Sequence, residues 1–125
     1  MLKTSDININ TDFLGGSVLL FNKPLQWSSF DVVKKVRNII KSGKKIGKIK
    51  VGHAGTLDPL ADGLLIVCTG KFTKRVEEIQ GQKKVYTGEI TIGSTTPSYD
   101  KETEIDEAFE TSHITENLIY SSCKK

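Results

Sequence analysis

Cysteine and histidine are scarce in this sequence, which has two of each among its 125 residues. Two cysteines, Cys68 and Cys123, cannot build the disulfide framework of a small secreted domain. Together with His53 and His113 they also lack the spacing of a zinc-type ligand cluster, so we expect no bound metal. Cys68 ends the apolar run of residues 64–68, a position typical of a small core residue.

Long apolar runs and a signal peptide are also missing. No stretch reaches the roughly 20 apolar residues that cross a membrane, and the first residues do not show the pattern of a secretory signal. Hydrophobic residues make up 37% and charged residues 26%, which are ordinary values for a soluble globular protein with one modest domain. The composition therefore favours a cytoplasmic protein that does not contact membranes.

Acidic residues are absent from one long segment. Between Val32 and Leu57 there is no aspartate or glutamate, although the net charge of the whole chain is only +3. A concentrated basic segment suggests a polyanionic partner, but a solvated helix face followed by a lysine-rich loop would give the same pattern. The eight basic residues of the segment are Lys34, Lys35, Arg37, Lys41, Lys44, Lys45, Lys48 and Lys50.

Hydrophobic periodicity predicts one long amphipathic helix. Residues 28–31 have the spacing of a capping box, and apolar residues then recur at intervals of three and four. We expect this helix to end near Gly43, because glycine commonly terminates helices. Its expected apolar face consists of Phe30, Val33, Val36 and Ile40.

Shorter patterns predict strands and further helices. Apolar or alternating runs predict strands over residues 17–22, 49–51, 64–68 and 83–93. A short helical turn is expected from Pro59, and short helices are expected over residues 73–79 and 112–122. The polar residues 1–10 lack periodicity and are expected to form a loose terminus.

Residues 51–63 are the most informative segment of the chain. Gly52 and Gly55 permit unusual backbone angles and close approach to a ligand. Asp58 precedes a proline, so its carboxylate could cap a helix start and would be held on a turn. His53 and Thr56 are close to it in sequence. An ordinary helix cap beside a hydrogen-bonded turn histidine explains the same pattern without any catalytic role.

The order of residues in this segment closely resembles a known catalytic signature. Residues 52–61 read GHAGTLDPLA and are followed by GLL at residues 63–65. This run resembles the signature of the TruB family, whose members are tRNA pseudouridine synthases that act on the T-loop uridine of tRNA.

Three other segments resemble motifs of the same family. Residues 22–29 resemble its first motif, usually Asp-Lys-Pro-x-Gly, but depart from it at Asn22 and Gln26. Residues 84–93 resemble its second motif, which carries an active-site tyrosine. Residues 93–100 resemble its Gly-x-x-Thr-x-Thr-x-Asp segment, with proline and serine as departures at positions 97 and 98.

The resemblance implies a fold and a chemistry. The implied fold is α+β, with a mixed, largely antiparallel sheet and flanking helices. The implied reaction turns uridine into pseudouridine through Asp58, acting as a carboxylate nucleophile at either the ribose C1′ or the uracil C6. Because the reaction involves no redox change, neither a cofactor nor a metal is expected.

The resemblance also implies roles for residues outside the nucleophile. His53 would hold flipped-out nucleotides, and Tyr86 would stack on the target base. Lys23, Thr56 and Asp100 would also lie at the substrate-binding site. The eight basic residues between Val32 and Leu57 would contact the phosphates of the tRNA T arm. No obligate protein partner is implied.

The resemblance covers residues 18–100, the first part of a longer catalytic domain. We expect a flexible segment over residues 1–16 and the N-terminal part of the catalytic domain over residues 17–125. The family has a later arginine that pairs with the catalytic aspartate, and this sequence has no arginine after Arg75. The chain alone is therefore expected to be inactive. A non-catalytic RNA-binding fragment and a guide-RNA-dependent relative remain alternative hypotheses.

Overall fold

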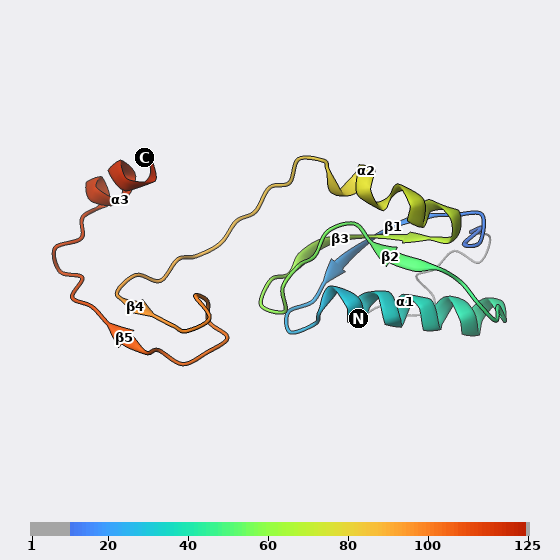
Figure 1. Cartoon of the computed structure of the whole chain (residues 1–125), viewed down its shortest axis with the longest axis horizontal. Coiled ribbons are helices and arrows are strands. Elements are labelled where there is room, and N and C mark those ends of the chain that lie inside the picture. The colour runs from blue at the N-terminus through green and yellow to red at the C-terminus, as the bar shows by residue number, and fades with distance from the viewer. Residues whose placement is uncertain (1–10, 125) are drawn as a thin grey trace. The chain divides into compact units, whose positions relative to one another are not determined.

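The computed structural model describes residues 11–124, which divide into two compact units at residues 84 and 85. The first unit holds a three-stranded sheet with helices α1 and α2 beside it, and the second holds two short strands and helix α3 (Figure 1). Residues 1–10, which include most of the expected flexible segment, lie outside the described residues. The combination of helices and antiparallel strands confirms the expected α+β class.

The sheet of the first unit is antiparallel throughout. Its strands are β1 (Val18–Lys23), β2 (Val51–His53) and β3 (Gly63–Thr69), in the order β1-β3-β2. The strands expected over residues 17–22 and 64–68 are confirmed within one residue. A strand was expected over residues 49–51, but β2 covers residues 51–53. Val51, Gly52 and His53 pair with Thr69, Cys68 and Val67 of β3.

Helix α1 (Ser29–Lys44) starts where its capping box predicts. The Asp31 backbone N–H donates to Ser28 Oγ at 3.1 Å, and the Ser28 backbone N–H donates to Asp31 Oδ2 at 2.9 Å. Hydrogen bonds from the Ser28 hydroxyl and backbone lower the pKa of the Asp31 carboxyl below its usual value. The box therefore persists at neutral pH, where the carboxylate is ionised.

One detail of the expected helix is wrong. Phe30 is 60% exposed, because the buried positions lie on an arc that runs through Ser29, Val32 and Val36. The helix ends at Lys44, near Gly43 as expected, but Lys45 takes the left-handed conformation at its end, with a φ of 52°. Its backbone N–H then bonds the last carbonyls, as a glycine usually does at a helix end.

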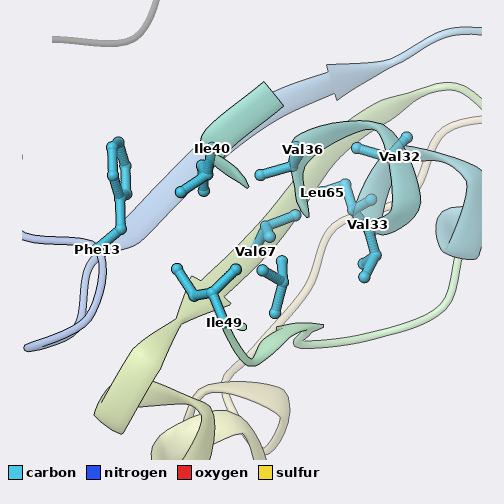
Figure 2. Packing of buried hydrophobic residues seen from close by; sticks show 9 residues of the cluster. Phe13, Val32, Val33, Val36, Ile40, Ile49, Leu65 and Val67 are labelled. Atoms are coloured by element: carbon cyan, nitrogen blue, oxygen red, sulfur yellow. The ribbon is translucent and has the colours of Figure 1, made fainter. Parts of the chain in front are cut away.

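The hydrophobic core of the first unit lies between α1 and the sheet. Figure 2 shows valines of α1 directed toward Leu65 and Val67 of β3, whose side chains are 1% and 0% exposed. Phe13, only 2% exposed, joins the same core, so the packed residues begin before the boundary that we expected at residue 16. Cys68 is buried as expected, and burial raises the pKa of its thiol.

A sharp turn follows β3 and leads into the expected short helix. Helix η2 (Gly70–Arg75) has 3-10 geometry and continues into α2 (Val76–Gln80). Gly70 makes the turn with a φ of +53°, and a Cβ at this position would clash with the carbonyl oxygens of Phe13 and Leu14. Only glycine can therefore bring the chain this close to the N-terminal turn.

The second unit contains β4 (Ser94–Thr95) paired with β5 (Glu107–Ala108), followed by α3 (Glu116–Cys123). The helix expected over residues 112–122 is confirmed with a later start, because Thr115 caps it by accepting from the Leu118 backbone N–H. No hydrophobic side chain of residues 85–124 is buried.

The strand expected over residues 83–93 is wrong. Residues 83–92 form no strand, and Val85 and Ile90 are 84% and 91% exposed. The alternation of side chains satisfies only half of what a strand requires. The backbone also needs a partner strand, and no described strand pairs with this segment.

Two features are absent from the described residues. No helix between residues 11 and 124 has both the length and the apolar character to cross a bilayer. The same residues contain no group of three or more histidine, cysteine, aspartate or glutamate side chains placed to hold a metal ion.

Alanine substitutions at two glycines should change stability in opposite directions. Gly70→Ala should lower the free energy of unfolding by about 2–4 kcal/mol, because the methyl group meets two carbonyl oxygens and the φ is positive. Gly43→Ala should raise it by about 0.5–1 kcal/mol, since Gly43 is helical and a Cβ there meets nothing within 4 Å. Urea denaturation measures both values, and a loss of similar size at both positions would contradict this account.

Candidate functional site

The candidate site is the loop that joins β2 to β3, residues 54–62. The loop leaves the sheet after His53 and returns to it at Gly63. Gly55 and Gly63 have φ values of 110° and 117°, which permit the two reversals of chain direction. Gly52 does not have a positive φ, because it lies in β2 and pairs with Cys68.

Asp58 begins a tight turn in the middle of this loop. The Ala61 backbone N–H donates to the Asp58 carbonyl at 3.0 Å. The short helical turn expected from Pro59 is present as this single hydrogen-bonded turn, because the chain enters β3 at Gly63 before a longer helix could form. Among residues 11–124, no hydrogen bond or ion pair reaches the Asp58 carboxylate, and the side chain is exposed. The carboxylate is therefore open to a ligand from solution.

The backbone on the N-terminal side of Asp58 is tied to helix α1. The Ser29 hydroxyl donates to the Leu57 carbonyl at 3.0 Å and accepts from the Leu57 N–H at 2.9 Å. Ser29 is only 3% exposed, and the Leu57 side chain packs against the core. Our reading of the sequence did not single out Ser29. Its position in a motif with two successive serines was the available signal.

The backbone on the C-terminal side of Asp58 is tied to the turn that precedes α1. The Gln26 backbone N–H donates to the Pro59 carbonyl at 2.7 Å. Gln26 has a φ of 65°, a conformation that normally favours glycine. The motif that this segment resembles has a glycine at this position. Gln26 keeps the left-handed conformation of the turn, at some cost in backbone strain.

Lys23 stabilises the same turn from inside. Its side chain is 0% exposed, and its ammonium donates to the carbonyls of Pro24 at 3.0 Å and Trp27 at 2.6 Å. We had placed Lys23 among the substrate-binding residues by resemblance. The structure directs its ammonium to the backbone of its own turn, which is the region that holds Pro59 through Gln26.

His53 has a defined tautomer at the start of the loop. Its Nδ1 lies 2.8 Å from the Gly55 carbonyl oxygen. Because a carbonyl can only accept, Nδ1 carries the proton and Nε2 is left as an acceptor in the neutral ring. His53 is half-buried and Thr56 is exposed, so the two differ in their accessibility to a ligand.

The basic residues differ in how they are placed. Arg37 donates from Nη2 to the Val51 carbonyl at 3.2 Å, which joins α1 to β2. The Lys44 ammonium lies 5.9 Å from the centre of the Phe13 ring. Lys35 is half-buried, and the remaining five are exposed: Lys34, Lys41, Lys45, Lys48 and Lys50.

A shallow hollow of ≈ 380 Å³ lies beside the first turns of α1. It is bordered by two lysines and by the half-buried ring of Trp27. Its full lining is Gln26, Trp27, Asp31, Lys34, Lys35 and Asn38.

Tyr86 and Asp100 belong to the second unit. Tyr86 is 69% exposed. The Asp100 carboxylate accepts from Ser98 Oγ at 2.6 Å and from the Glu102 N–H at 2.9 Å, and these bonds lower its pKa. The first unit alone brings together the residues of the first motif and the turn that carries Asp58.

Comparisons with known proteins agree with the motifs. Residues 42–125 match the family described as TruB family pseudouridylate synthase, N-terminal domain. The chain is 57% identical over 117 residues to tRNA pseudouridine synthase B of Flavobacterium johnsoniae, covering 91% of this chain and 50% of the relative.

Two further relatives carry the same name. The protein of Parabacteroides distasonis is 56% identical over 108 residues, covering 86% of this chain and 46% of the relative. The protein of Chloroherpeton thalassium is 52% identical over 111 residues, covering 88% of this chain and 45% of the relative. The chain thus spans about half the length of the curated relatives that it matches.

Replacing Gln26 by glycine should stabilise the protein. The left-handed conformation costs a non-glycine residue about 1–2 kcal/mol, and glycine loses about 0.5–1 kcal/mol of backbone entropy on folding. Gln26→Gly should therefore raise the free energy of unfolding by about 0.5–1 kcal/mol. Leu25→Gly is the matched control: Leu25 has no positive φ, so the variant should be less stable than the parent. Equal losses in both variants, measured by urea denaturation, would contradict the proposed strain.

Proposed function

The chain belongs to the TruB family of pseudouridylate synthases, and on that basis we propose that it supplies the catalytic aspartate of a tRNA pseudouridine synthase. The proposed substrate is the uridine of the T loop, and the proposed nucleophile is Asp58. The observation that carries the proposal is the loop at residues 54–62. It combines the family's signature with an exposed carboxylate on a turn whose backbone is fixed on both sides.

The chemistry suits a carboxylate at this place. Pseudouridine forms when the C–N glycosidic bond of uridine breaks and the ribose C1′ is joined to a carbon of the same base. No electron is gained or lost overall. A carboxylate can add to either the ribose C1′ or the uracil C6, form a covalent intermediate and then leave. Asp58 is exposed, so a nucleotide that has left its stack can approach it.

Other residues of the chain would hold the RNA. The exposed lysines from Lys34 to Lys50 would lie against phosphates of the T arm, where each contact releases counterions. His53 offers Nε2 as an acceptor, and Thr56 offers an exposed hydroxyl beside Asp58. Tyr86 would stack on the target base, and Asp100 would accept hydrogen bonds from the substrate.

Arg37 and Lys23 have different roles in this proposal. Both are committed to backbone carbonyls, so their main contribution would be to hold the site rather than to contact the RNA. This revises the roles that the resemblance implied for them. The exposed lysines remain the proposed phosphate contacts.

Asp58→Asn tests the catalytic role directly. In the protein as its gene encodes it, this variant should form no detectable pseudouridine and should bind tRNA within a few-fold of the parent. Asparagine keeps the size and hydrogen-bonding capacity of the side chain but removes the nucleophilic charge. Asp62→Asn is the matched control, because Asp62 is an exposed carboxylate in the same loop, and it should retain activity.

Tritium release from tRNA labelled in its uridines measures both variants. Retained turnover in Asp58→Asn would refute the catalytic assignment. If neither the parent nor the Asp62→Asn variant releases tritium although both bind tRNA, the non-catalytic RNA-binding reading is the correct one.

The salt dependence of tRNA binding tests the lysines. Replacing Lys45 and Lys48 by glutamine should reduce the slope of log K against log salt concentration by about 1–2 units, because two phosphate contacts are lost. Replacing Lys71 and Lys74, which are exposed on η2, provides a control with the same change of charge. An identical change of slope in both pairs would show that only net charge matters and that the lysines of this segment have no special role.

A further inference from the structure

We propose that Ser29 is a positioning residue that fixes the backbone of the Asp58 turn against helix α1. This inference rests on the proposed function, since it concerns the same aspartate. The hydrogen bonds between the buried Ser29 hydroxyl and Leu57 can be tested by a measurement that does not depend on enzymatic activity.

The hydroxyl of Ser29 satisfies both polar backbone groups of one residue. Oγ donates to the Leu57 carbonyl at 3.0 Å and accepts from the Leu57 N–H at 2.9 Å. The two residues are 28 positions apart in sequence. Ser29 is 3% exposed, so water cannot easily replace these bonds. The Ser29 side chain therefore satisfies the backbone N–H and carbonyl of Leu57, as a neighbouring strand would in a sheet.

The bonds from Ser29 lie one residue away from the proposed nucleophile. On the other side of Asp58, the Gln26 backbone N–H holds the Pro59 carbonyl at 2.7 Å. Asp58 thus stands between two anchored residues. Both anchors come from residues 26–29, beside the turn that Lys23 stabilises through its bonds to the Pro24 and Trp27 carbonyls.

The direction of the Asp58 carboxylate depends on these backbone anchors. In the part of the chain that the structure describes, no side chain holds this carboxylate in place. Catalysis requires reacting atoms in a defined geometry, and a misplacement of about 1 Å can cost about 10²-fold in rate. Loss of the Ser29 bonds should therefore act on the chemical step more than on RNA binding.

Ser28 provides a matched control in the adjacent position. Its hydroxyl accepts from the Asp31 N–H and caps α1, but it makes no bond to the loop at residues 54–62. Ser28→Ala and Ser29→Ala remove the same group from neighbouring residues. Only Ser29→Ala should release Leu57. Ser29→Thr keeps a hydroxyl and should restore most of what Ser29→Ala loses.

The experiment compares the three variants with the parent protein as its gene encodes it, at a temperature where circular dichroism shows all four to be folded. Ser29→Ala should reduce the single-turnover rate of pseudouridine formation by about 10–100-fold, with the Kd for tRNA within a few-fold of the parent. The Leu57 amide should exchange its hydrogen about tenfold faster or more. Ser28→Ala should leave the rate and the Leu57 exchange close to those of the parent.

The outcomes separate this inference from the proposed function. An unchanged Leu57 exchange in Ser29→Ala, or an equal loss of rate in Ser28→Ala, would overturn the positioning role. If the parent forms no pseudouridine, the proposed function fails. The exchange of the Leu57 amide then still decides whether Ser29 fixes the turn.

Discussion

The packing of helix α1 against strand β3 is the constraint on which the first unit depends. Valines of α1 and the residues Leu65 and Val67 of β3 form the buried core. This contact fixes where the N-terminal end of α1 lies, and that end carries the groups that hold the loop between β2 and β3. A hydrophobic interaction without chemical specificity thus sets the position of a chemically specific loop.

Two motifs that are far apart in sequence form one structural element through this packing. The first motif supplies anchors at Gln26 and Ser29, and the signature supplies the carbonyls and the amide that they bind. Lys23 keeps the first motif in its turn by donating to two of its carbonyls. This arrangement explains why a lysine-proline turn accompanies the aspartate: the turn holds the loop that presents the carboxylate.

Local patterns in the sequence predicted much of the fold. The capping box located the start of α1, and the apolar runs located β1 and β3, because these features depend on nearby residues. The signature located Asp58 on a turn. The sequence could not reveal that Ser29 binds Leu57, because a hydrogen bond over 28 positions leaves no local pattern. The alternation of residues 83–93 misled us for the converse reason: it predicts a strand whether or not a partner strand is available.

The central proposal is that Asp58 is presented to a uridine of the tRNA T loop that has left its stack. A crystal structure of the protein, as its gene encodes it, bound to tRNA tests this claim most directly. The account predicts a T-loop uridine outside its stack, with the Asp58 carboxylate as the closest carboxylate to its ribose and base, and with the bonds of Ser29 and Gln26 to the loop intact. A stacked uridine, or a flipped one that meets another carboxylate such as Asp62, would contradict it.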